Sequence, residues 1–112
     1  MVDTRSEMEV LVNNYKVLIF NGEYDLIVNT ASVNAEISSL AWDGEEEYKQ
    51  SNLSAWYGNS TTGEEKLRGF FSKTRDFCRV IVHGAGHQVP RDNPTATLDM
   101  MMQFVEHGCL QI

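Results

Sequence analysis

The segment VHGAGHQVP at residues 82–90 contains two of the three histidines of the chain, His83 and His87. Histidines four residues apart share a face only on a helix, and the glycines and Pro90 oppose a helix here. No glutamate lies between the two histidines, so the helical zinc motif is absent. The Lys-Ser/Thr pair that completes a phosphate-binding P-loop is absent as well. The segment therefore predicts neither a metal site nor a phosphate-binding loop.

A general base is the third chemistry that this segment allows, and His87 is the candidate. A neutral imidazole accepts a proton near neutral pH, and glycines beside it leave room for a substrate. Such a base needs a carboxylate to fix its tautomer and stabilise the imidazolium. Asp25, in the segment NGEYD at residues 21–25, is the candidate carboxylate, and it precedes His87 as in the α/β-hydrolase arrangement. A structural loop histidine remains the alternative at His87.

The other two histidines are expected to play no part in chemistry. His83 should close a strand, and no carboxylate pairs with it in the sequence. His107 falls near the end of the last predicted helix, where a protonated imidazole interacts favourably with the helix dipole.

Short apolar runs predict the strands that lead into these loops. Residues 15–20 (YKVLIF) and 77–83 (FCRVIVH) are rich in β-branched side chains, which favours buried strands. The loop with Asp25 follows the first run, and the glycine loop follows the second. We expect further short strands around residues 55–57 and 69–71.

Apolar residues at helical spacing predict two helices. Asn29 or Thr30 can cap the first, and Asp92 or Asn93 can cap the second, which ends at Gly108. The stripes expected to face the core are Val33, Ile37, Leu40 and Ala41 in the first helix and Leu98, Met101, Met102 and Val105 in the second.

Alternating strands and helices predict an α/β fold with a mainly parallel sheet. In such sheets, ligands and catalytic groups lie in the loops at the carboxyl ends of strands. The loops that contain Asp25 and His87 are both of this kind. Residues 43–68 are expected to form a polar excursion on the surface, with the acidic run at residues 45–47 on a solvated face.

Composition and charge exclude several classes of protein. The chain of 112 residues is 42% hydrophobic, enough for one modest core, and its net charge of −7 opposes nucleic-acid binding. It contains no apolar run of membrane-spanning length, and its first residues lack the apolar region of a signal peptide. Cys78 and Cys109 form neither a metal pattern nor a disulfide framework, and either is compatible with a free buried thiol. Asn52 and Asn59 lie in sequons, which become glycosylated if the chain enters the secretory pathway.

Two segments resemble the motifs of one enzyme family. NGEYDLIVN at residues 21–29 resembles the aspartate loop of the serine carboxypeptidases, Tyr/Asn-Gly-x-x-Asp-x-x-x-Asn after a Val-Leu-Ile strand. GAGHQVPRDNP at residues 84–94 resembles that family's histidine loop, Gly-x-Gly-His-x-Val-Pro-x-Asp-x-Pro. The likeness runs from about Glu9 to Gly108 and includes a loose similarity to the vitellogenic-like branch.

The resemblance implies roles for individual residues. Asp25 and His87 would be the aspartate and histidine of a Ser-Asp-His triad that releases C-terminal amino acids from peptides. Asn29 matches the family's asparagine four positions after the aspartate. Val28 stands where some members have a cysteine beside the substrate pocket. Gln88 stands where many members have a methionine that lines the leaving-group pocket, so these three are candidate substrate-binding residues, and no metal or organic cofactor is implied.

The nucleophile motif Gly-x-Ser-x-Gly is absent from the chain. Ser60, in GNSTTG, has the wrong spacing around it and is not expected to be the nucleophile. The resemblance therefore implies that residues 1–112 are a single partial domain, the C-terminal part of an α/β-hydrolase catalytic domain. Its serine would come from an N-terminal part of the same enzyme, and the location would be lysosomal, vacuolar or secreted.

Two other functions remain open. The same machinery serves acyltransferases, in which an alcohol replaces water as the acceptor. Alternatively, the chain is a non-catalytic fragment or packing partner that lacks the nucleophile. Expected partners are the C-terminus of a peptide substrate, the part of the enzyme that carries the serine, and a second copy in a homodimer, but neither nucleic acid nor membrane.

Overall fold

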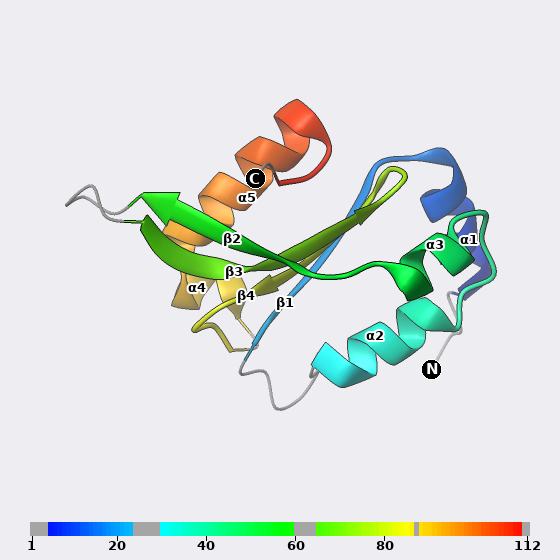
Figure 1. Cartoon of the computed structure of the whole chain (residues 1–112), viewed down its shortest axis with the longest axis horizontal. Helices are drawn as coiled ribbons and strands as arrows, with labels where there is room; N and C mark the ends of the chain where they lie inside the picture. The colour runs from blue at the N-terminus through cyan, green and yellow to red at the C-terminus, as the bar shows by residue number, and fades with distance from the viewer. Residues whose placement is uncertain (1–4, 24–29, 60–64, 87, 111–112) are drawn as a thin grey trace.

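The computed structural model describes residues 5–23, 30–59, 65–86 and 88–110. In chain order its elements are α1 (Arg5–Asn14), β1 (Val17–Gly22), α2 (Thr30–Ser38), α3 (Glu45–Gln50), β2 (Ser54–Asn59), β3 (Glu65–Thr74), β4 (Phe77–Val82), α4 (Val89–Asp92) and α5 (Pro94–His107). The molecule is elongated, with α1 and α3 toward one end and α4 and α5 toward the other (Figure 1).

The described strands form one sheet in the order β1-β4-β3-β2. β1 and β4 run parallel, as expected, whereas β4–β3 and β3–β2 are antiparallel. The reason is the connection between β3 and β4, which consists of Arg75 and Asp76 alone. A parallel pair needs a crossover of a dozen or more residues, and the path from β1 to β4 has that length. The mainly parallel sheet that the element order predicts is therefore wrong for these four strands taken together.

Helices cover both faces of the sheet (Figure 1). Alternate side chains of β4 point to opposite faces, as they must in a strand. Cys78, Val80 and Val82 pack with α4 and α5 in one buried cluster. Phe77 packs with α1, α2 and the segment after α2 in a second cluster. The expected single core is thus two apolar layers, one on each side of the sheet.

α5 has the bounds that its end signals predict. The side chain of Asn93 accepts a hydrogen bond from the backbone N–H of Ala96, and Gly108 ends the helix with a left-handed φ of 81°. Its predicted core stripe is nevertheless wrong. The buried face consists of Ala96, Thr97 and Met100. The four stripe residues are exposed, namely Leu98, Met101, Met102 and Val105.

α2 is shorter than its pattern predicts. The helix ends at Ser38, so Leu40 and Ala41 lie beyond it. Ile37 and Leu40 are both buried in the second cluster, whereas Ala41 is exposed. Residues 43–68, which we expected to form a polar excursion, contain α3, all of β2 and the start of β3. The short strands expected at residues 55–57 and 69–71 are confirmed within β2 and β3.

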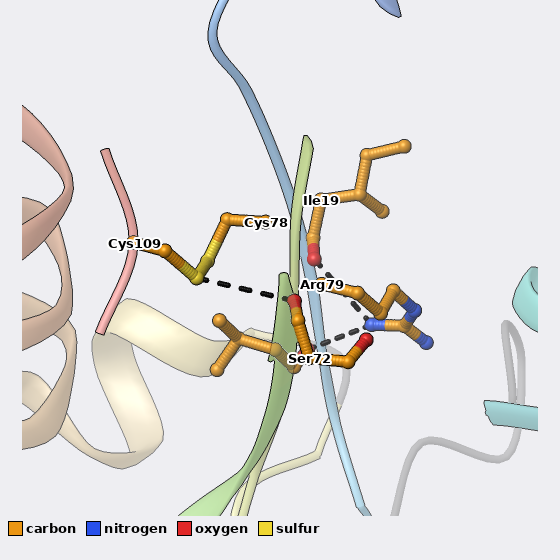
Figure 2. The surroundings of a disulfide bond; sticks show 6 residues. Ile19, Ser72, Cys78, Arg79 and Cys109 are labelled. Atoms are coloured by element: carbon orange, nitrogen blue, oxygen red, sulfur yellow. Dashed lines mark hydrogen bonds between the residues drawn. A yellow bond between two sulfur atoms is a disulfide. The ribbon is translucent and has the colours of Figure 1, made fainter. Parts of the chain in front are cut away.

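The two cysteines are bonded to each other, so the prediction that they form no disulfide framework is wrong. Cys78 in β4 and Cys109 after α5 are joined with a Cα–Cα distance of 5.3 Å, and both are buried. Figure 2 shows the bond on the side of β4 opposite to the Arg79 side chain. The pairing arises because α5 packs back on the sheet and brings together residues 31 positions apart. The spacing of the two cysteines in the sequence does not predict this packing.

Candidate active site

Four of the predicted site residues lie outside the described residues: Asp25, Val28, Asn29 and His87. Ser60 also lies outside them. The structure does describe the segments on either side of both loops, up to Glu23 after β1 and on both sides of His87 after β4. The part of the site that can be described is therefore the start of each loop, where it leaves its strand.

The two loops leave neighbouring strands at the same edge of the sheet. β1 and β4 are paired in parallel with Gly22 opposite Val82. The N–H of Glu23 donates to the carbonyl of Val82 at 2.9 Å, which extends the pairing one residue beyond β1. Parallel strands present their carboxyl ends together, which is where catalytic loops lie in α/β sheets.

The bases of the loops touch at Gly22. A Cβ atom at this position would lie 2.2 Å from the carbonyl oxygen of Gly86 and 2.3 Å from that of Ala85. Only a glycine permits such an approach of two backbones. Gly86 directly precedes His87. The start of the aspartate loop is therefore in contact with the residue before the candidate general base.

Gly22→Ala is expected to lower kcat/KM by about 10- to 100-fold, because the methyl group must push the two loops apart and misplacement of about 1 Å has effects of that size. Overpacking should also reduce the free energy of unfolding by about 1–3 kcal/mol. Steady-state kinetics of the assembled enzyme and urea unfolding would measure both effects. Gly58→Ala is the matched control, because the atoms it meets belong to the flexible Arg68 side chain. Equal behaviour of the two variants would contradict the close approach.

Hydrogen bonds hold the histidine loop at both ends. The N–H of His83 donates to the carbonyl of Arg68 at 2.8 Å. The N–H of Gly86 donates to the Asp92 carboxylate at 2.9 Å, and Asn93 reaches the carbonyl of His83 at 3.5 Å. Gly84 has a φ of 72°, in the region that favours glycine. The junction of α4 and α5, at Asp92 and Asn93, therefore holds the histidine loop through hydrogen bonds.

Gln88 is exposed directly after His87, at the start of α4. Its backbone carbonyl accepts from the N–H of Asp92 at 2.9 Å, which fixes the main chain there. The role of its side chain in substrate binding stays a prediction.

His83 has a partner that the sequence reading missed. Its Nδ1 lies 2.7 Å from Oε2 of Glu23, so the expectation that no carboxylate pairs with it is wrong. The strand register accounts for the contact. Glu23 and His83 are each the first residue after their strand, and those strands are neighbours.

Arg79 is a second feature that the sequence did not predict. Its guanidinium is buried on the face covered by α2 and α3, where it donates to the side chains of Asn34 and Asn21 and to the carbonyl of Val80. Burial lowers the pKa of Arg79, and burial likewise raises the pKa of the nearby Tyr48. A cavity of about 350 Å³ adjoins Arg79, lined mainly by polar side chains. It lies beside the middle of β4, away from the ends that bear the two loops.

Among residues 5–23, 30–59, 65–86 and 88–110, no group of three or more His, Cys, Asp or Glu side chains is placed to hold a metal ion. None of the helices in the same ranges is long and apolar enough to cross a membrane.

Comparison with known proteins identifies the class. The sequence profile of the serine carboxypeptidases matches residues 1–107, so the chain belongs to the serine carboxypeptidase family, which has an α/β-hydrolase fold. The probable serine carboxypeptidase CPVL of Homo sapiens is 35% identical over 95 residues, which are 85% of this chain and 20% of that protein. The venom serine carboxypeptidase of Apis mellifera is 36% identical over 99 residues, 87% of this chain and 20% of that protein. The chain thus spans about a fifth of the length of these relatives.

Proposed function

We propose that this chain supplies the aspartate and histidine of a Ser-Asp-His triad, Asp25 and His87, in a carboxypeptidase that releases C-terminal amino acids from peptides. The observation that carries the proposal is the contact between the two loop bases at Gly22 and Gly86. Membership of the serine carboxypeptidase family supports it.

In this mechanism the serine belongs to the part of the relatives' length that the chain does not span. Its hydroxyl oxygen attacks the carbonyl carbon of the last peptide bond while His87 accepts the hydroxyl proton. His87 then donates that proton to the nitrogen of the leaving amino acid, and the C–N bond breaks. Asp25 holds the imidazole in the required tautomer and stabilises the imidazolium. Water, activated by His87, hydrolyses the acyl-enzyme, so the triad needs no metal ion or organic cofactor.

Substrate choice is proposed to involve Val28, Asn29 and Gln88. The exposed Gln88 stands next to His87, close to where the leaving amino acid would depart. An amide at this position favours a polar leaving group more than a thioether does, because it can donate and accept hydrogen bonds. An acyltransferase would share the same triad, with an alcohol in place of water.

We also propose a lysosomal, vacuolar or secreted location. The buried Cys78–Cys109 disulfide is of the kind that persists in oxidising compartments. The sequon residue Asn52 is exposed between α3 and β2, as a glycan acceptor must be. The other sequon residue, Asn59, is the last residue of β2.

A packing function is the second candidate, and one surface favours it. α5 exposes a row of apolar side chains, of which Val105 is 79% and Leu98 is 63% exposed. Such a row marks a surface that another part of the enzyme or a second copy in a homodimer would cover. If this function stood alone, the chain would fold with a partner and take no part in catalysis.

The proposed function is tested by expressing the chain alone and joined to the region that carries the serine. Release of C-terminal amino acids from N-blocked dipeptides is expected only from the joined protein. A fluorophosphonate probe, which labels activated serines, should likewise react only with the joined protein. Labelling of the chain alone would show a reactive serine within these 112 residues and contradict the proposal.

A further inference from the structure

One side-chain contact joins the two candidate catalytic loops among the described residues. Oε2 of Glu23 and Nδ1 of His83 lie 2.7 Å apart. Glu23 stands two residues before Asp25, and His83 stands four residues before His87. The contact therefore bridges the start of one loop to the start of the other.

Both partners sit on backbone that is held in place. The N–H of Glu23 donates to the carbonyl of Val82 at 2.9 Å, and the N–H of His83 donates to the carbonyl of Arg68 at 2.8 Å. The bridge thus connects two fixed points of the sheet, and the segment that it constrains is the chain that follows Glu23. That segment leads directly to Asp25.

The Glu23–His83 contact is proposed to act by fixing direction and not by adding stability. The side chains are 35% and 40% exposed, and pairs at such sites contribute about 0–1 kcal/mol to stability. A short hydrogen bond still fixes direction, because it restricts the rotamers of both side chains and the course of the backbone that bears them. Geometry within a triad is sensitive to displacements of about 1 Å.

We propose that Glu23 and His83 are a positioning pair that sets the angle at which the aspartate loop leaves the sheet, and so the approach of Asp25 to His87. The pair acts through Asp25 and does not touch substrate. The inference rests on the proposed function of Asp25 and His87.

The test is a double-mutant cycle in the assembled enzyme. Glu23→Ala and His83→Ala should each lower kcat about 10- to 100-fold with KM within about twofold, because the triad and not substrate binding is disturbed. The double variant should be no worse than either single variant, since both remove the same contact. Glu23→Gln, which keeps an acceptor, and His83→Asn, which keeps a donor near Nδ1, should restore most of kcat.

Glu45→Ala is the matched control. It removes the Lys49–Glu45 pair on α3, whose side chains are 41% and 35% exposed, and it should leave kcat unchanged. Additive losses in the double variant, or no recovery with the conservative variants, would overturn the positioning role. So would an unchanged kcat in Glu23→Ala when His87→Ala abolishes activity.

A second measurement separates this inference from the proposed function. Amide resonances of residues 24–29 in the 112-residue chain should shift in the same way in Glu23→Ala and in His83→Ala, and stay unchanged in Glu45→Ala. If His87→Ala leaves activity intact, the proposed function fails. The shifts of these amide resonances then decide by themselves whether Glu23 and His83 position the aspartate loop. Unrelated shifts in the two variants would overturn it.

Discussion

His87→Ala and Asp25→Asn are each expected to lower kcat of the assembled enzyme by at least about 100-fold. Alanine at position 87 removes the group that accepts and returns the proton. Asparagine at position 25 keeps the shape of the carboxyl group, but its NH₂ cannot accept the imidazole N–H, so the wrong tautomer is favoured. KM should change little, because both groups act mainly in the transition state.

The double variant gives the sharper result. Residues of one catalytic unit lose activity non-additively, so the loss in His87→Ala/Asp25→Asn should equal that of His87→Ala alone. His107→Ala is the control, because His107 is exposed at the end of α5 and adjoins only Glu106 among the ion pairs of the described residues. The four variants and the wild type are compared by their initial rates on N-blocked dipeptides. Rates within about threefold of wild type for either loop variant would exclude the triad assignment.

Loss of the Cys78–Cys109 bond is expected to reduce the free energy of unfolding by about 3–4 kcal/mol, from the loop-closure entropy of the 31-residue separation. The double replacement Cys78→Ala/Cys109→Ala removes the link between β4 and the segment after α5. Leu110 and Cys109 both belong to the buried cluster on that face, so the segment should loosen first. Urea unfolding of the 112-residue chain measures the change.

Reduction provides the control for this experiment. The reduced wild type should unfold near the same urea concentration as the double variant, and reductant should leave the double variant unaffected because the chain has no other cysteine. A wild type whose stability does not respond to full reduction would contradict a stabilising role for the bond.

Local signals predicted the elements that bear the candidate site. The apolar runs predict β1 and β4, and the residues Asn93 and Gly108 predict the ends of α5, because caps and strand runs depend on neighbouring residues. The face of α5 was not predictable in the same way. Ala96 and Met100 lie on its buried side and Val105 on its exposed side, and helical spacing is satisfied by either set.

Contacts between distant segments account for the other failures. The antiparallel direction of β3 follows from the turn at Arg75 and Asp76, where Arg75 adopts a φ of 54°. No glycine or asparagine marks that turn in the sequence, although such residues usually mark positive φ. The Glu23–His83 contact and the disulfide likewise depend on register and packing, which a single sequence does not display.

The surroundings of Arg79 have a consequence for how the strand before His87 responds to acid. An arginine stays protonated in proteins, and its hydrogen-bond partners here are the amides of Asn21 and Asn34, the carbonyls of Ile19 and Val80 and the Tyr48 phenol, whose pKa burial raises. None of these groups gains or loses a proton between about pH 4 and pH 8. A carboxylate in their place would be neutralised as the medium acidified, and β4 would lose a buried ion pair. With neutral partners, the hydrogen bonds that hold the Arg79 side chain of β4 are expected to persist across that range of pH.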